Sequence, residues 1–499
     1  MINEAIRSLQ PYVERIPSVS RPTGHLSFKQ KLSWTAAVLL LYFALSNVTV
    51  FGLSPESIDV LAQYRAFLAG ASGSILALGI GPIVTASIIL QLLVGAGIIR
   101  LDLNDPSDRA AYQNFQRLLV IVMIVLTALP QILGGFLQPN LEIASTLGVS
   151  PGVISFLILF QLFVGGMLIV YMDEIVTKWG IGSGVSLFIM ASISQALISG
   201  LFNWVPVEGQ QAPMNIPGII PTWIWISQNV PMDQLLSAGG FGFMLIQGGL
   251  LALLTTVIII LMVVFAEGTR VEIPLAHSMV RGARGRFPIK LIYASVLPMI
   301  FVRALQANIT VIGMVLYRRG ITVFGDYANI NDQLQPVNGL MYMLSPISGP
   351  QDWIPSMVRE VPQYADLPTW MIVGHVFTDA AVLIVGCVVF AIFWVQTAGM
   401  DAKSVANQLM GSGMQVPGFR KNRAVLERVL QRYIPRLTVL GGITLALLAL
   451  VANMMGTIGQ VGGTGLLLAV SIAYRFYQDL AKEQMTEMHP MLRRFLGEE

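Results

Sequence analysis

The sequence predicts an all-α integral membrane protein with ten membrane-spanning helices, and three observations lead to this prediction. Residues of the set AVILMFWYC make up 55% of the 499 residues and charged residues only 11%, whereas a soluble globular protein carries roughly 25% charge. Ten apolar runs are long enough to span a bilayer, and basic residues gather in alternate connections between them. This composition excludes a soluble enzyme, a disordered protein and a free nucleic-acid-binding protein. The lone Cys387 excludes an internal disulfide and a cysteine zinc cluster.

The N-terminal segment is expected to remain in the cytosol. Residues 1–33 are polar, hold three prolines and lack the early apolar run of a secretory signal. After this segment, apolar runs of about 20 residues follow one another along the chain. The predicted spans are residues 34–52, 76–99, 117–138, 151–171, 183–204, 241–266, 289–316, 370–398, 437–456 and 460–478.

The positions of Lys and Arg predict the orientation. With the N-terminus inside, 25 of the 30 basic residues fall in inside segments, as the positive-inside rule requires. An odd number of spans would reverse the later loops and remove this asymmetry. The sequence therefore predicts a multi-pass membrane protein with both termini in the cytosol.

The chain is predicted to consist of two halves. Residues 1–204 hold five spans and residues 241–499 hold the other five, with an external loop at 205–240 between them. If the halves are related, the second is inverted, because each contains an odd number of spans. This loop and a second outside loop at 317–368 are expected to cap the bundle.

Residues 53–75, between the first two spans, are open to two interpretations. They start polar, continue as a short amphipathic stretch and end in small residues from Ala69 to Ser74. Periodicity alone favours an outside loop with one helical turn. The alternative is a half-helix folded back into the bundle, which requires a water-filled interior, since irregular backbone at membrane depth must line a cavity.

Motifs for covalent chemistry are missing. The four histidines are far apart, and neither H-E-x-x-H nor G-x-S-x-G occurs. The glycine-rich stretch 173–184 lacks the Lys-Ser/Thr of a phosphate-binding loop. The sequence therefore predicts no enzyme and no cofactor. A small-solute transporter would explain ten spans equally well, but it predicts coordinating polar groups near the midplane, and carboxylates within the predicted spans are nearly absent.

Arg303 is the one charge that this reading places in the middle of a span. An intramembrane charge is a functional-site hypothesis by default. The competing interpretation is a structural cation paired with a carboxylate outside the spans. Both interpretations remain open at the level of the sequence.

Short strings along the whole chain resemble SecY, the large alpha subunit of the protein-conducting translocon, in its archaeal and eukaryotic form. They occur in order and with matching spacing from about residue 5 to residue 495, and together they are specific although each alone is weak. The strings are Phe28–Leu32, Leu78–Ala86, Gln91–Gly95, Asp173–Gly184, Arg270–His277, Phe393–Val395, Gly418–Lys421 and Gly462–Gly465.

The resemblance implies an hourglass channel built from two inverted five-helix halves around a central pore. Residues 53–75 then correspond to a re-entrant plug helix. The family closes its pore with a ring of branched apolar side chains, and such a ring resists ions by dewetting. Without the resemblance, ordinary core packing would explain these residues. The matching positions are Ile80, Val84, Val185, Ile189, Ile300 and Leu468.

The resemblance also implies a lateral gate between spans two, three, seven and eight. Thr85, Thr127 and Asn308 fall at its polar positions, although some relatives carry a carboxylate where this chain has Thr127. Arg303 departs from the family pattern, which has an uncharged residue there, and so no family role is transferred to it.

The function that the resemblance implies is the passage of unfolded polypeptides across the membrane and the sideways release of hydrophobic segments into lipid. No nucleotide site is visible, so an outside motor, the ribosome, would supply the energy. The basic loops 267–289 and 399–436 would dock it through phosphate contacts, although the positive-inside rule alone also explains them. The implied ribosome contacts are Arg270, Arg420, Lys421 and Arg423.

The resemblance implies further partners and a location. The partners are SecE (the gamma subunit), a small beta subunit, the nascent chain with its signal sequence, the receptor of the signal recognition particle and membrane lipid. The expected location is the cell (plasma) membrane.

Overall fold

A computed structural model describes residues 17–24, 26–99, 105–206, 217–235, 237–246, 248–277, 284–330, 333–411, 414–415, 423–459 and 461–488. Within these residues, ten long helices correspond one to one to the predicted spans. They are α2 (Phe28–Ser46), α4 (Gly81–Gly95), α5 (Pro106–Leu133), α7 (Pro151–Trp179), α8 (Gly184–Phe202), α12 (Leu250–Gly268), α13 (Leu297–Arg318), α16 (Thr369–Thr397), α18 (Arg423–Met455) and α19 (Gly462–Met488).

Seven of these helices are long and apolar enough to cross a membrane by length and composition. Helices α2 and α19 correspond to the first and last predicted spans, and polar residues within them lower their mean hydropathy. Helix α4 has only 15 residues, because the start of the predicted span 76–99 is a series of turns rather than helix. The chain is a multi-pass, all-α membrane protein.

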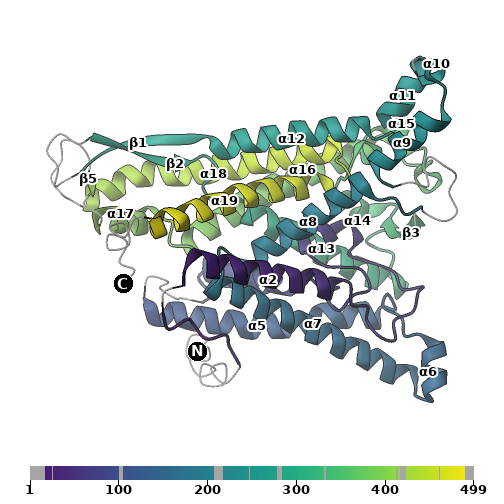
Figure 1. The fold of residues 1–499 in the computed structure, drawn as a ribbon, viewed down its shortest axis with the longest axis horizontal. Coiled ribbons are helices and arrows are strands. Elements are labelled where there is room, and N and C mark those ends of the chain that lie inside the picture. Colours follow the sequence, from purple (N-terminus) through teal and green to yellow (C-terminus); the bar gives the residue numbers. More distant parts are fainter. Residues whose placement is uncertain are drawn as a thin grey trace.

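The long helices run roughly along the long axis of the molecule (Figure 1). Helices α2 to α8 form the N-terminal half, and α12 to α19 form the C-terminal half. The halves meet where α4 packs against α13 and α16, and where α8 packs against α19. The start of α2 and the last turns of α19 lie at one end, where Lys31 forms an ion pair of 2.8 Å with Glu483.

The described parts of the two long basic connections at this end contain strands and helices, whereas the sequence suggested loops. Strands β1 (Arg270–His277) and β2 (Arg284–Lys290) form an antiparallel hairpin, and β5 (Met414–Gln415) pairs with β1. Helix α17 (Ala402–Gly411) follows α16, and residues 423–436 already belong to α18. Ile273 and Ile289 of the hairpin pack in one apolar cluster with α17 and α18. Burial of this apolar cluster explains why these connections are folded. The end of the molecule that carries the cluster is termed the hairpin end.

The opposite end, termed the loop end, carries the two predicted outside connections. Trp353 donates a hydrogen bond of 3.0 Å to the Met454 carbonyl, which attaches the second connection to the end of α18. The predicted span 241–266 is interrupted before α12 begins, where Gly249 has φ +69°. The short elements here are α6 (Leu141–Leu147), α9 (Ile219–Asn229), α10 (Met232–Leu235), α11 (Ala238–Ile246), β3 (Tyr327–Ile330), β4 (Gln333–Pro336), α14 (Gly339–Leu344) and α15 (Pro355–Val358).

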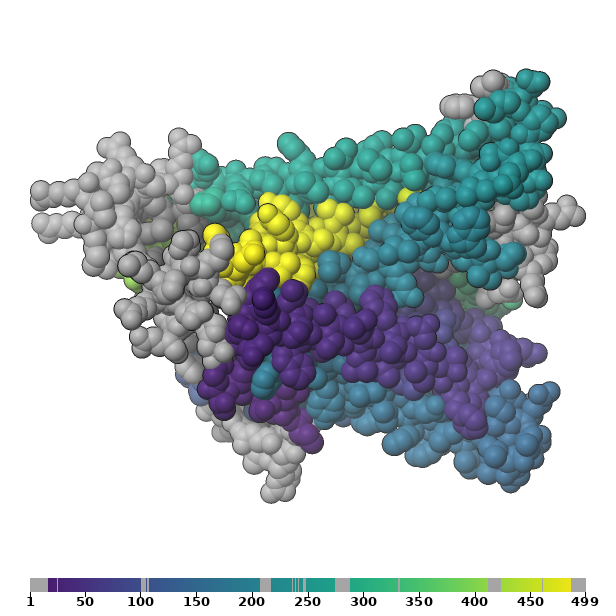
Figure 2. Space-filling model, in the orientation of Figure 1, coloured from purple at the N-terminus to yellow at the C-terminus, as the bar shows by residue number. Residues whose placement is uncertain are grey.

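Large apolar side chains cover much of the outer surface. Leu40, Phe160, Phe265 and Phe377 are 55–79% exposed on α2, α7, α12 and α16. Figure 2 shows one such face, with α19 (yellow) between α12 (teal) and α2 (purple). So much exposed apolar surface is unfavourable in water and favourable against lipid, in agreement with the predicted class.

Candidate functional site

The segment between α2 and α4 folds back into the bundle. It forms a 3₁₀ turn (Ala62–Tyr64) and the short helix α3 (Arg65–Leu68). Tyr64, Phe67 and Leu68 are at most 5% exposed and belong to the central apolar core. The folded-back interpretation of residues 53–75 is therefore confirmed, and the outside-loop alternative is wrong.

The backbone just before α4 fits closely against this re-entrant segment. The Ile80 amide donates a hydrogen bond of 2.7 Å to the Leu68 carbonyl. Gly79 has φ +55°, and a Cβ atom there would lie 2.0 Å from the same oxygen. Only glycine permits both this conformation and this approach, which gives the Leu78–Ala86 string a structural reason.

Two tyrosines attach the re-entrant segment to both halves. Tyr42 on α2 donates a hydrogen bond of 2.9 Å to the Ala69 carbonyl. The Tyr64 hydroxyl lies 2.9 Å from the Thr310 hydroxyl on α13. The segment is thus held by polar contacts to one helix of each half.

The six predicted ring residues come from α4 and the residue before it, and from α8, α13 and α19, and they lie in or against one apolar core. Val185 is half-buried, and the other five are at most 3% exposed. The same core contains Phe67 and Leu68 of the re-entrant segment. Branched side chains from both halves and residues of the re-entrant segment therefore belong to one apolar core.

Asp173 positions one of these residues. Its carboxylate accepts a hydrogen bond of 2.9 Å from the Val185 amide in the first turn of α8. A Cβ atom on Gly184 would lie 2.6 Å from the Asp173 Cα, so the connection requires glycine. The glycine-rich stretch 173–184 is therefore the end of α7 and the turn into α8, and it places Val185.

Two of the three predicted gate residues, Asn308 and Thr85, are in contact with each other. The Asn308 side-chain amide on α13 donates a hydrogen bond of 3.0 Å to the Thr85 hydroxyl on α4, across the boundary between the halves. It also donates a hydrogen bond of 2.9 Å to the Ala304 carbonyl of its own helix. The Thr127 hydroxyl on α5 instead donates to Met123 of its own helix, at 2.6 Å.

Arg303 is paired with a carboxylate inside the bundle. Its guanidinium lies 3.1 Å from Asp379 on α16, and the two side chains are 2% and 0% exposed. Asp379 lies within the predicted span 370–398, so the interpretation of Arg303 as the single mid-span charge was wrong. The proposed partner outside the spans was also wrong. A carboxylate among apolar neighbours hardly changes the hydropathy of its window, but the presence of one buried cation was a signal to search for it.

The predicted ribosome contacts are only partly described. Arg270 is exposed in the first position of β1, and Arg423 is exposed in the first turn of α18, 3.9 Å from Glu427. Both lie at the hairpin end. Arg420 and Lys421 lie outside the described residues.

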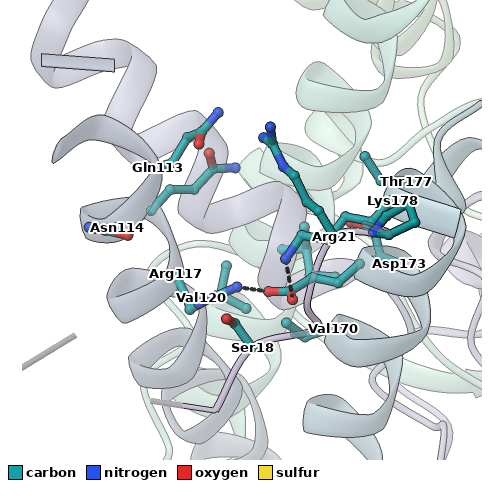
Figure 3. Close-up of a pocket in the computed structure, with 14 residues that line it drawn as sticks. Ser18, Arg21, Gln113, Asn114, Arg117, Val120, Val170, Asp173, Thr177 and Lys178 are labelled. Atoms are coloured by element: carbon teal, nitrogen blue, oxygen red, sulfur yellow. Dashed lines mark hydrogen bonds and ion pairs between the residues drawn. The ribbon is translucent and has the colours of Figure 1, made fainter. Parts of the chain in front are cut away.

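A cavity of about 790 Å³ lies between α5 and α7 at the hairpin end (Figure 3). Glu174 forms ion pairs with Arg117 and Lys178 beside it. The Glu174 carboxylate also accepts a hydrogen bond of 3.0 Å from the Val19 amide. The Lys178 ammonium donates a hydrogen bond of 2.6 Å to the Val19 carbonyl. These contacts attach the N-terminal segment to α7, on the same end as the last turns of α19.

The described residues hold no group of three or more His, Cys, Asp or Glu side chains that could bind a metal ion. Cys387 is buried, with its thiol 3.9 Å from the Met299 sulfur. What the core offers is physical rather than covalent chemistry. It is an apolar core that joins both halves and the re-entrant segment, beside a seam between the halves, and this arrangement is typical of a polypeptide-conducting membrane channel.

Comparisons with known proteins agree with this class. The SecY family model matches residues 74–477, and the model for the plug domain of Sec61p matches residues 40–73. The protein translocase subunit SecY of Archaeoglobus fulgidus is 66% identical over 499 residues, with 100% of both chains covered. That of Halobacterium salinarum is 48% identical over 491 residues, with 98% of each chain covered.

Solved structures show the same similarity. "The structure of a protein conducting channel" has a TM-score of 0.77 and 37% identity, and covers 97% of this chain and 98% of that one. "Sec61 in the Canine ribosome-channel complex from the endoplasmic reticulum" has a TM-score of 0.74 and 36% identity over the same shares. The chain belongs to the SecY family. It is a channel subunit of a protein translocase, a class that conducts unfolded polypeptides and releases hydrophobic segments into lipid without enzymatic chemistry.

Proposed function

We propose that Ile80, Val84, Val185, Ile189, Ile300 and Leu468 form the constriction through which a passenger polypeptide moves. The observation that supports this proposal is that these residues, from both halves, lie in or against one apolar core that also contains the plug residues Phe67 and Leu68. Their side chains have no hydrogen-bond donors or acceptors, so a moving backbone finds no group to bind. An apolar constriction also opposes the entry of ions by dewetting.

Disulfide cross-linking tests this ring. Single cysteines replace the six residues in a chain with Cys387→Ser, and a stalled passenger carries one cysteine. Each ring position should cross-link to the passenger. Cysteines at lipid-exposed Phe160 and Phe377 are the matched controls and should not react. A folded channel that cross-links at the controls but at none of the six positions would contradict the ring.

The seam between α4 and α13, with Thr127 on the neighbouring α5, serves as the lateral gate. A signal with eight leucines gains roughly 2–5 kcal/mol on reaching lipid, at ~0.3–0.6 kcal/mol each, and one central charge costs ~2.5–3.5 kcal/mol. A gate that lets the passenger contact lipid can therefore sort segments by hydrophobicity alone. The contact between α4 and α13 and the Asn308–Thr85 hydrogen bond support this assignment.

The hairpin end serves as the ribosome-docking surface, through Arg270, Arg420, Lys421 and Arg423. The exposure of Arg270 and Arg423 supports it, as does the similarity to Sec61 in a ribosome-channel complex. Phosphate contacts are strongly salt-dependent. Arg270→Glu with Arg420→Glu should therefore weaken ribosome binding and flatten its salt dependence. The control, Lys403→Glu with Arg432→Glu, has the same charge change. Equal losses in both double variants would leave only general charge attraction.

The remaining assignments follow the family. The protein lies in the plasma membrane, and its hairpin end faces the cytosol. The two halves are residues 1–204 and 241–499, with the external loop 205–240 between them. The plug comprises about residues 53–75. The partners are SecE, a small beta subunit and the receptor of the signal recognition particle. Co-purification from the native membrane tests the partners, and a chain recovered without a single-span subunit would contradict the first of them.

A further inference from the structure

A buried polar cluster joins four helices of the C-terminal half. Arg303 on α13 donates to Gln306 at 2.8 Å, to Asp379 on α16 at 3.1 Å and to Thr464 on α19 at 3.2 Å. The Thr464 backbone and hydroxyl both donate to the Asn453 side chain on α18, at 2.6 and 3.0 Å. None of these five side chains belongs to an assigned gate, ring or docking surface.

The cluster lies directly beside two ring residues along their helices. Arg303 follows Ile300 by three residues on α13, and Thr464 precedes Leu468 by four residues on α19. Residues three or four apart lie on the same helix face. A hydrogen bond between Arg303 and Thr464 therefore fixes the two helices relative to each other about one turn from the ring.

The cluster also reaches the plug. The Thr310 hydroxyl donates a hydrogen bond of 2.9 Å to the carbonyl of Gln306, the residue that Arg303 contacts. The same hydroxyl lies 2.9 Å from the Tyr64 hydroxyl of the plug. One face of α13 thus connects the plug, the ring and the cluster.

Stability alone does not explain an ion pair in this place. Desolvation of two buried charges offsets much of their attraction, and an apolar pair of similar size is often as stable or more stable. What a guanidinium adds is direction, because its planar donors fix several acceptors at once. Asp379 Oδ1 accepts from both Arg303 and Gln306, so the helices have one register in which all of these contacts form.

We propose that the Arg303–Asp379 pair is a positioning brace for the constriction. It holds α13 and α19 in the register in which Ile300 and Leu468 close on the plug. Arg303 and Asp379 do not contact the passenger. They act through the ring, so this inference rests on the proposed ring.

The test compares Arg303→Leu, Asp379→Leu and the double Leu variant in planar bilayers, with resting ion conductance measured per folded channel. Each single variant leaves a buried group without its partner and should lower folded yield. The double variant should fold at parental yield yet leak about tenfold more, which corresponds to a shift of ~1.4 kcal/mol in the balance between closed and open states. A double variant that folds and seals like the parent would overturn the brace and leave a purely structural pair.

Arg303→Lys keeps the argument testable if the double variant fails to fold. Lysine retains the charge but not the planar fork, so this variant should fold and still leak more than the parent. Parental conductance in Arg303→Lys would overturn the proposal. Val385→Leu, at a lipid-exposed position of α16, is the control and should leave conductance unchanged. If ring cysteines cross-link to a passenger while the brace variants seal, the brace alone fails. If the ring cysteines do not cross-link to a passenger, the proposed ring itself is wrong.

Discussion

The two faces of α13 are held to their neighbours by contacts of very different strength. Toward the N-terminal half, a neutral hydrogen bond joins Asn308 to Thr85 on α4, and the exposed Arg318 at the end of α13 donates a hydrogen bond of 3.1 Å to the Gly134 carbonyl after α5. Toward α16 and α19, Arg303 makes charge-assisted contacts that are almost fully excluded from solvent. Charge-assisted hydrogen bonds are roughly twice as strong as neutral ones.

For the proposed lateral gate, this difference predicts which boundary of α13 opens. A helix that separates from one neighbour and stays with the others moves along its weakest boundary. Helix α13 should therefore remain with the C-terminal half when the α4 side yields. The plug contact through Tyr64 and Thr310 is intermediate, because it is neutral but buried.

The largest effect on stability is expected at the strong face. Thr464→Val removes a hydroxyl that accepts from Arg303 and donates to Asn453. The loss should lower the free energy of unfolding by about 1–3 kcal/mol, because polar groups remain buried without a partner. Denaturant unfolding in detergent measures it.

Thr438→Val is the matched control for this change. Thr438 is also buried, at 2% exposed against 5% for Thr464, but its hydroxyl donates to the Ile434 carbonyl of its own helix. Its substitution should cost clearly less. Equal losses for the two variants would mean that the cluster contributes no more than an ordinary helix hydroxyl.

A smaller effect is expected at the plug contact. Tyr64→Phe removes one hydrogen bond worth about 0.5–1.5 kcal/mol, while Thr310 keeps its bond to Gln306. Folded yield should stay constant and resting ion conductance should rise. Tyr293→Phe, which removes a hydroxyl bonded to the Met400 carbonyl at 2.7 Å, is the control. An equal rise in conductance in both variants would mean that the leak does not result from loss of the plug contact.

The smallest effect is expected at the seam. Asn308→Leu removes a hydrogen bond across the boundary, and such bonds in membranes average about 0.6 kcal/mol. Since one leucine contributes ~0.3–0.6 kcal/mol to insertion, the hydrophobicity threshold for sideways release should fall by about one leucine. A graded Leu/Ala series in the passenger measures this threshold.

Thr127→Val sharpens the same comparison. The Thr127 hydroxyl is bonded to Met123 of its own helix, so its removal should shift the threshold less than Asn308→Leu does. An equal shift of the threshold in both variants would mean that Thr127 contributes as much to the seam as Asn308 does. An unchanged threshold in both variants would remove the polar seam from the gating mechanism.

The sequence by itself determined the membrane class and the asymmetry of the basic residues, and it predicted ten spans, each of which coincides with a helix. These properties are local, because hydropathy depends on about 20 consecutive residues and orientation on charges near their ends. The resemblance further predicted the plug, and residues 53–75 do fold inward, although their own periodicity favoured an outside loop. The sequence also predicted Asn308 and Thr85 as polar residues of one seam.

Only the tertiary structure decided which distant groups meet. Arg303 and Asp379 are 76 residues apart, and nothing in either segment specifies the partner. The basic connections show the same limit, because the β1–β2 hairpin is ordered by burial of Ile273 and Ile289 against α17 and α18. Helix periods and charge counts describe a chain in one dimension. The cost of burying a charge or an apolar face is settled by neighbours that become adjacent only when the helices pack.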